Sequence, residues 1–194
     1  MMEEKQIHKL FKTKNALLEG HFLLTSGLHS SVYLQCAKVL QYPDIAEKLC
    51  SQLAKHFSKD KVDVVISPAV GGIIVGQEVA RTFGVRAIFA ERVDSKMILK
   101  RGFELTKGEK VLAVEDVITT GGSLKEIIQV AKDKGCNIAG VGSLVDRSGS
   151  KVRFGVEKFS LLNLKILNYP KESCPLCKQG IPLTYLGSRN NSSR

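Results

Sequence analysis

The segment Val111-Leu-Ala-Val-Glu-Asp-Val-Ile-Thr-Thr-Gly-Gly-Ser123 joins an apolar strand to a helix through an acidic and glycine-rich connection. Its four leading apolar residues predict a buried parallel strand, and two acids, Glu115 and Asp116, stand where that strand would end. After the glycines, apolar residues recur at helical spacing from Leu124 to Ala131. The segment therefore predicts a strand, an acidic pair, a loop and a helix N-terminus in succession.

The loop of this segment has the chemistry of an anion site. A helix N-terminus leaves backbone N–H groups unpaired, and the helix dipole favours negative charge there. Gly121 and Gly122 let the backbone approach a ligand closely, while Thr119, Thr120 and Ser123 add hydroxyl donors. The preceding carboxylates repel phosphate but accept hydrogen bonds from sugar hydroxyls, so the whole predicts a ribose phosphate site. The alternative is an ordinary capped turn, which acids at the carboxyl end of a strand count against.

Bulk composition restricts the class of protein. A chain of 194 residues with 43% apolar content can bury one core, so we expect a single α/β domain over residues 1–186 and a disordered tail at 187–194. No stretch approaches the ~20 apolar residues of a membrane span. Five scattered cysteines argue against a disulfide framework and predict a cytoplasmic protein. The net charge of +10 suits steering of polyanionic small molecules, but a generally basic composition or nucleic-acid affinity would explain it equally, and no nucleic-acid-binding motif is present.

Strand and helix patterns alternate from residue 44 to residue 144, which predicts a parallel sheet covered on both faces. Before this region we expect a helix over about 3–19 that stops at Gly20, and an extended pair within 21–35 around Ser26-Gly27. After it we expect a last strand over 160–167 and an irregular tail from Tyr169.

Residues 111–123 resemble the phosphoribosyl-pyrophosphate (PRPP) signature of the type I phosphoribosyltransferases. The resemblance implies that family's fold, with a small hood built from about residues 1–40 and C-terminal segments, and transfer of ribose 5-phosphate from PRPP to a nitrogenous base. Pro68–Gly72 resembles the family's pyrophosphate loop. The PRPP-binding residues implied in this sequence are Val70, Gly71, Arg92, Lys96, Glu115, Asp116, Val117, Ile118, Thr119, Thr120, Gly121, Gly122 and Ser123.

The long basic connection Arg92–Arg101 has two interpretations. It is either a solvated charged hairpin or a flap that closes cations over the departing pyrophosphate and excludes water. The resemblance favours the flap and implies that Lys96 neutralises the leaving group, while Glu115 and Asp116 lie near a forming oxocarbenium ion. Mg²⁺ is the implied cofactor, bridging pyrophosphate and ribose hydroxyls with no direct protein ligand.

The base is suggested by two further segments. Residues 20–35 resemble the hood strand of the orotate phosphoribosyltransferases, which implies that Tyr33 and Leu34 flank the base. Val145-Asp146-Arg147 resembles their Asp-Arg step, which implies that Arg147 holds the orotate carboxylate and that Thr119 meets the base from below. The implied role is in pyrimidine (UMP) biosynthesis, by a homodimer that shares its flap between subunits, with neither nucleic acid nor membrane as partner. Two alternatives are a purine or xanthine phosphoribosyltransferase and a PRPP-sensing regulator.

The chain departs from the orotate pattern at four positions. Thr25, Gly71 and Val93 stand where many of these enzymes have lysine, and Ile98 stands where they have histidine. The departures resemble a divergent bacterial branch, and they put the pyrophosphate contacts in question. Lys100 and Arg101 are candidates to supply the missing charge.

Cys174-Pro-Leu-Cys177 offers only two of the four ligands that zinc needs. The pair is interpreted as a free dithiol or packing pair, with half of an intersubunit zinc site as the alternative. The four histidines show no ligand spacing and are expected to be structural or exposed; they are His8, His21, His29 and His56.

Overall fold

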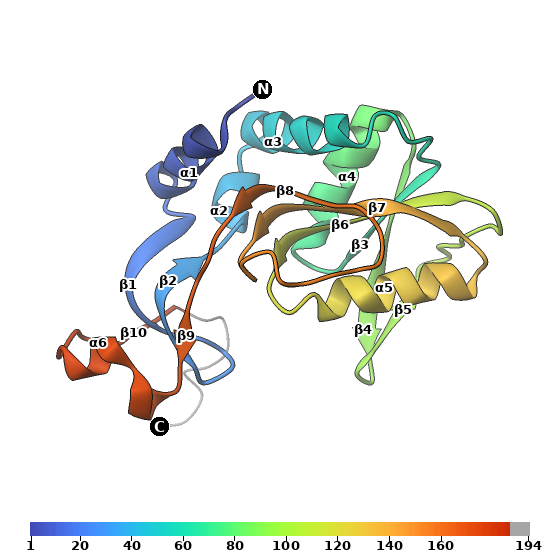
Figure 1. Ribbon diagram of the computed structural model, residues 1–194. Helices are drawn as coiled ribbons and strands as arrows, with labels where there is room; N and C mark the ends of the chain where they lie inside the picture. Colours follow the sequence, from blue (N-terminus) through green and yellow to red (C-terminus); the bar gives the residue numbers. More distant parts are fainter. Residues whose placement is uncertain (187–194) are drawn as a thin grey trace.

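The computed structural model describes residues 1–186, so the predicted tail at 187–194 lies outside it. Two sheets make up the molecule, a larger one flanked by helices and a smaller one beside it (Figure 1). Among the described residues, no helix is both long and apolar enough to cross a membrane.

The larger sheet has the strand order β5-β4-β3-β6-β7-β8, and every pair is parallel except β4 with β5. Helices α3 and α4 cover one face and α5 covers the other (Figure 1). The alternation of side chains along β6 produces both cores, since Leu112 and Val114 pack towards α3 and α4, whereas Val111 and Ala113 pack towards α5. The bounds are β3 Val64–Pro68, β4 Arg86–Val93, β5 Lys96–Leu99, β6 Lys110–Ile118, β7 Asn137–Asp146, β8 Lys158–Asn163, α3 Pro43–His56, α4 Gly72–Phe83 and α5 Gly122–Asp133.

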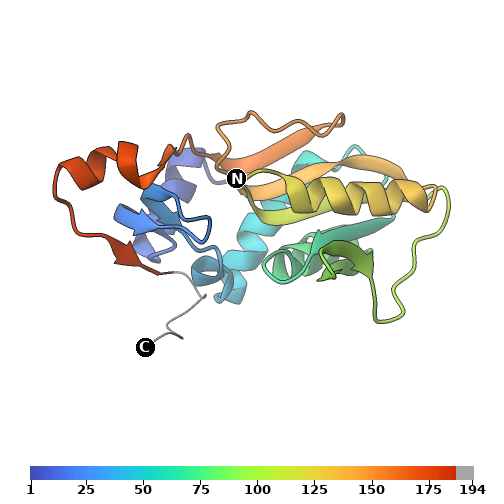
Figure 2. The ribbon, with the colours of Figure 1, turned by 90° about the horizontal axis from the view of Figure 1, so that it is seen from below.

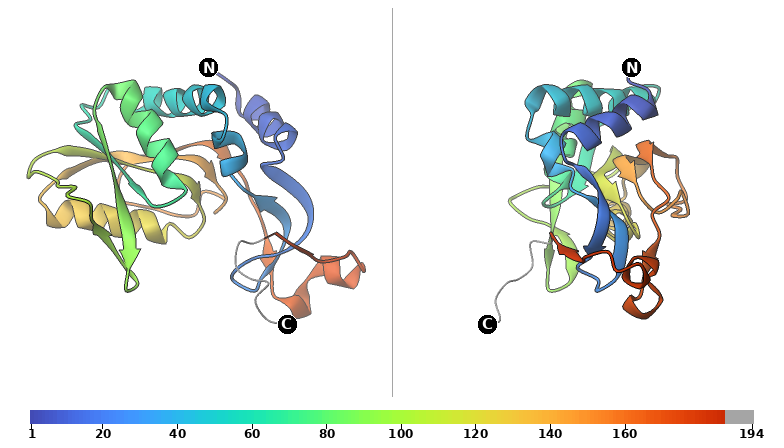
Figure 3. Two further views of the ribbon diagram at one scale, coloured as in Figure 1. Left: turned by 180° about the vertical axis from the view of Figure 1, so that it is seen from behind. Right: turned by 90° about the vertical axis from the view of Figure 1, so that its left-hand side faces the viewer.

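The smaller sheet, called the hood sheet below, has the order β10-β1-β2-β9. Its centre is an antiparallel hairpin, and the two short outer strands come from the C-terminal segment (Figures 2 and 3). The ends of the chain therefore meet in one sheet. The bounds are α1 Glu4–Thr13, β1 Leu17–Leu23, β2 His29–Leu34, α2 Ala37–Leu40, β9 Asn168–Tyr169, a 3₁₀ turn at Lys171–Ser173, α6 Pro175–Lys178 and β10 Thr184–Tyr185.

The predicted parallel sheet with helices on both faces is confirmed, and so is the turn at Ser26-Gly27, where Gly27 has φ +80°. The helix predicted over 3–19 is wrong in its second half. It ends at Thr13, Asn15 takes a left-handed φ of +54°, and β1 begins at Leu17. Leu17 pairs with Leu34, and both Ala16 and Leu17 are buried. The free energy gained from this burial outweighs the helical propensity of the two residues. The tail expected to be irregular from Tyr169 contains two strand pieces and two helical turns.

A buried ion pair holds the end of β7. Asp146 is fully buried, its Oδ2 lies 2.6 Å from Lys158 Nζ, and its Oδ1 accepts hydrogen bonds from the N–H and hydroxyl of Ser148. Burial acts to raise the pKa of Asp146, but the hydrogen bonds from Lys158 and Ser148 outweigh it and leave the pKa below its usual range. The pair thus fixes the start of the loop that carries Arg147.

Replacing Lys158 with Met is expected to lower the free energy of unfolding by about 3 kcal/mol, because it leaves a buried carboxylate unpaired. The matched control is Lys12→Met, whose ion pair with Glu19 is solvent-exposed, and its stability should match that of the parent. Urea denaturation of the three proteins measures both values. Equal stability of the two variants would contradict the role given to the pair.

Candidate active site

Glu115 and Asp116 lie at the carboxyl end of β6, where both carboxyl groups are largely removed from water. Burial, with the neighbouring charge of Asp116 as the smaller cause, raises the pKa of Glu115 to about 8. Burial also raises the pKa of Asp116, against hydrogen bonds from the N–H groups of Val117 and of Asp116 itself. Neither carboxyl has an ion-pair partner within residues 1–186. The pair is therefore prepared for hydroxyl donors and positive charge from outside the chain.

The loop between β3 and α4 lies directly against these acids. A Cβ atom at Gly71 would come within 2.8 Å of both carboxylate oxygens of Asp116, so only glycine fits there without a shift. The lysine that the resemblance implies at this position would require the Asp116 carboxylate to shift. Val70 is 81% exposed, and the peptide bond between Ala69 and Val70 is cis. The structure thus brings the two predicted segments, 68–72 and 111–123, into contact.

The connection from β6 to α5 forms the predicted anion loop. Gly121 has φ +73°, and a Cβ atom there would meet Val152 at 2.5 Å, so glycine is required for both backbone and packing reasons. Thr119 and Thr120 are exposed. Within residues 1–186, the N–H groups of Ser123 and Leu124 have no hydrogen-bond acceptor, as expected for the first turn of a helix. These donors, at the positive end of α5, suit a phosphate.

A cleft of about 690 Å³ separates the hood sheet from the carboxyl ends of the large sheet. Its volume falls in the usual range for a small-molecule site. The structure brings five of the predicted site residues to its walls. They are Tyr33, Leu34, Thr119, Thr120 and Arg147, joined by Leu23–Ser26, Leu28, Ser148, Lys151, Val152, Ile166 and Asn168.

Arg147 is the half-buried cation of this cleft, and the other cation on its walls, Lys151, is exposed. Burial lowers the pKa of the Arg147 guanidinium group, and its Nη2 donates to the amide oxygen of Asn168 at 3.3 Å. No carboxylate of the described chain lies within ion-pair distance of Arg147, in contrast to Arg86 with Glu109 and Arg101 with Glu91. A half-buried guanidinium without an anion favours an anionic ligand in the cleft.

Strands β4 and β5 form a twisted hairpin from the predicted flap, with Asp94 and Ser95 at its turn. Arg92, which pairs with Met97 close to the turn, binds Glu126 of α5 at 2.8 Å and ties this part of the hairpin to the helix. Lys96 is exposed at the tip, and within the described part of the chain it has no hydrogen bond or ion pair with the acids of β6. The single chain therefore does not bring Lys96 to Glu115 and Asp116.

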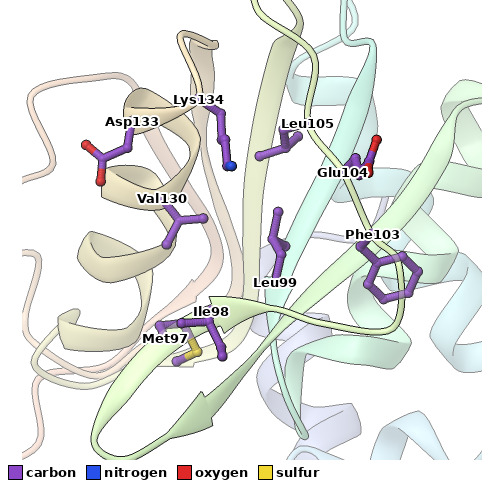
Figure 4. Close-up of a pocket in the computed structure, with 9 residues that line it drawn as sticks. All are labelled: Met97, Ile98, Leu99, Phe103, Glu104, Leu105, Val130, Asp133 and Lys134. Carbon is purple, nitrogen blue, oxygen red and sulfur yellow. The ribbon is translucent and has the colours of Figure 1, made fainter.

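A second cleft, of about 730 Å³, lies between β5, the segment 103–105 and α5 (Figure 4). It is slightly larger than the first, but it holds none of the predicted PRPP-binding or base-binding residues. Met97, Leu99 and Val130 line it beside the charged Asp133 and Lys134. Its walls contain neither a residue of the anion loop nor Arg147, both of which line the smaller cleft, so the site is the smaller cleft.

One interpretation of the sequence is corrected by the structure. Cys174 and Cys177 do meet a second pair of possible ligands within the chain, because His21 and His29 lie beside them. Linear spacing could not reveal this group, since the hairpin and α6 are about 150 residues apart. The available signal was the predicted hairpin around Ser26-Gly27, because its two strands carry His21 and His29 and lie side by side.

Comparisons with known proteins agree with this site. Residues 38–154 match the phosphoribosyl transferase domain family. The chain is 54% identical over 188 residues to an orotate phosphoribosyltransferase of Caldanaerobacter subterraneus subsp. tengcongensis, covering 97% of this chain and 99% of that one. It is 51% identical over 190 residues to that of Chlorobium phaeobacteroides, covering 98% of each. The crystal structure of the Aeropyrum pernix orotate phosphoribosyltransferase superposes with a TM-score of 0.69 at 27% identity, over 82% of this chain and 94% of that one.

The raised pKa of Glu115 predicts a pH-dependent stability. A carboxyl whose pKa is higher in the folded than in the unfolded protein stabilises the fold below its unfolded pKa, and this contribution is lost as pH rises towards 8. Glu115→Gln, in the absence of ligands, is therefore expected to gain stability over the parent between pH 5 and pH 8, by roughly a few kcal/mol. Urea denaturation across this range measures the gain. The exposed control Glu104→Gln should show no such trend, and a flat difference for Glu115→Gln would refute the assignment.

Proposed function

We propose, from the premise that this chain belongs to the orotate phosphoribosyltransferases of the phosphoribosyl transferase domain family, that it transfers ribose 5-phosphate from PRPP to orotate. The products are orotidine 5′-monophosphate and pyrophosphate, a step of pyrimidine biosynthesis. The half-buried Arg147, which lacks a carboxylate partner in the described chain, is the observation that carries the choice of an acidic base. We treat residues 1–186 as one domain with its hood from about 1–40 and C-terminal segments, and we propose a cytoplasmic location.

PRPP lies across the carboxyl ends of β3 and β6 in this proposal. Its 5-phosphate accepts hydrogen bonds from the loop of Thr119 to Ser123 and from the first N–H groups of α5. The ribose hydroxyls donate to Glu115 and Asp116, while the backbone at Val117 and Ile118 completes the wall. The pyrophosphate faces Val70 and Gly71. The contact of Gly71 with Asp116 supports this arrangement, because it places the two loops within one ligand's length.

Mg²⁺ fits the donor set, since two adjacent, desolvated carboxyls without a cation partner in the described chain lie near the end of β6. Bound with PRPP, the ion neutralises charge on the pyrophosphate and is held mainly through the substrate. Positive charge near Glu115 lowers the pKa of that carboxyl and favours its ionised form. Substrate binding is therefore expected to release a proton from Glu115 at neutral pH.

Orotate enters the cleft with its carboxylate on Arg147, through charge-assisted hydrogen bonds. Tyr33 and Leu34 flank the ring and Thr119 meets it from below. The ring nitrogen attacks the ribose carbon as pyrophosphate leaves, so the protein supplies no nucleophile. Ionised Glu115 and Asp116 stabilise the developing positive charge on the ribose, and catalysis consists of positioning and electrostatics.

The hairpin of β4 and β5 is the flap of this proposal. Lys96 and Arg92 neutralise the leaving pyrophosphate when it closes. Because Lys96 does not reach the acids of its own chain, we propose a homodimer in which the flap of one subunit covers the neighbour's site.

The function is tested by the change in orotate absorbance on adding PRPP and Mg²⁺. Arg147→Ala is expected to raise the KM for orotate at least about tenfold and to leave the KM for PRPP nearly unchanged, because only the base carboxylate is lost. Arg153→Ala, an exposed arginine of the following loop, is the control. Product with hypoxanthine or xanthine and none with orotate would overturn the proposal.

The shared flap is tested by mixing two inactive variants. Asp116→Asn and Lys96→Ala are each expected to reduce turnover far more than stability. A flap acting between subunits predicts that the refolded mixture recovers about a quarter of the parent activity, because half of the dimers regain one intact site. A mixture as inactive as its components would show that each chain uses its own flap.

A further inference from the structure

Four side chains gather at the outer end of the hood, away from the large sheet. His21 comes from β1 and His29 from β2, while Cys174 immediately precedes α6 and Cys177 lies within it. Their ligand atoms all lie within 4.8 Å of one another. His21, His29 and Cys174 are at most 2% exposed, and only Cys177 faces solvent.

The spacing of these atoms approaches a tetrahedron. Zinc bond lengths to imidazole and thiolate place tetrahedral N···S pairs about 3.5 Å apart. The three short N···S separations here are 3.5 Å from His21 Nε2 to Cys174, 3.7 Å from the same atom to Cys177, and 3.3 Å from His29 Nδ1 to Cys177. The two nitrogens are 2.8 Å apart, so an ion at the centre requires them to separate by roughly half an ångström.

The hydrogen bond of His21 selects its metal-binding tautomer. His21 Nδ1 lies 2.8 Å from the carbonyl oxygen of Ile181, a group that only accepts, so Nδ1 carries the proton and Nε2 bears a lone pair. That lone pair faces His29, Cys174 and Cys177 together, and a single acceptor cannot satisfy three donors. A cation at the centre uses all four atoms, and the carbonyl is then the outer partner that metal-bound histidines ordinarily have.

The C-terminal segment has little else to hold it. Between residues 164 and 186, Cys174 is the single buried residue, and β9 and β10 each pair with the hairpin over only two residues. So small a structure buries too little apolar surface to be stable without a cross-link. A metal would supply that link between the segment and the hairpin.

We propose that His21, His29, Cys174 and Cys177 form a structural Zn²⁺ site that fastens the C-terminal segment to the hood hairpin. Two neutral imidazoles and two thiolates are a closed zinc ligand set, and no position remains for a reacting water. The site also fixes one wall of the base cleft, because Leu23–Ser26 and Leu28 lie between the two histidines and Asn168 precedes the cysteines. The zinc site does not depend on the proposed function.

Elemental analysis of the purified protein tests the proposal, with about one zinc per chain as the expected result. Cys177→Ser, the exposed ligand, should reduce zinc to below about a tenth per chain, whereas Cys136→Ser, a cysteine outside the cluster, should retain it. Cobalt added to the chelator-treated parent should give the thiolate charge-transfer and tetrahedral absorption bands, a readout that needs no variant to fold.

A purified parent without stoichiometric zinc, together with no thiolate band on cobalt addition, would overturn the site. A Cys174–Cys177 disulfide that persists in protein purified with zinc present would do the same, and so would equal zinc content in Cys177→Ser and the parent.

Discussion

The structure depends on the carboxyl groups of Glu115 and Asp116 near the end of β6. Placing them there costs free energy, because both groups lose contact with water. Burial raises the pKa of Glu115 to about 8, and in residues 1–186 no cation compensates either acid. Such a pair is unfavourable in the free protein and becomes favourable with hydroxyl donors and a cation present. Gly71 leaves room for the Asp116 carboxylate, which a larger side chain at that position would displace. The desolvation cost and the proposed ligand contacts are therefore concentrated at one edge of the sheet.

The proposed site has charges of opposite sign at separate places, the two acids on β6 and Arg147 after β7. In the proposed function the acids and the N-terminus of α5 bind the ribose phosphate, whereas Arg147, held at the start of its loop by the Asp146–Lys158 pair, binds the base. The hood sheet supplies the opposite wall with Tyr33 and Leu34. Because that wall is built from both ends of the chain, its position depends on how firmly the C-terminal segment is fastened, which is the role given to the zinc site.

The amino-acid sequence predicts the central part of the molecule well, because local periodicity and tertiary packing agree there. The strand, loop and helix predicted within Val111–Ser123 are present in that order, but β6 runs through both acids to Ile118 instead of ending before them. The hood was harder to predict, since its strands are short and are stabilised by partners distant in sequence. The apolar spacing of residues 3–19 suits a helix, yet Leu17 pairs with Leu34. The ligand role proposed for His21 and His29 could not be predicted, because it depends on contacts with a segment about 150 residues away in the sequence.

A crystal structure with PRPP and Mg²⁺ is the most direct test of the central claim, that the end of β6 and the start of α5 hold a ribose phosphate. The account predicts the 5-phosphate within hydrogen-bond distance of the backbone N–H groups of Gly122 to Leu124, and the ribose hydroxyls on Glu115 and Asp116. A phosphate bound elsewhere, with both carboxyl groups left without a ligand, would contradict it.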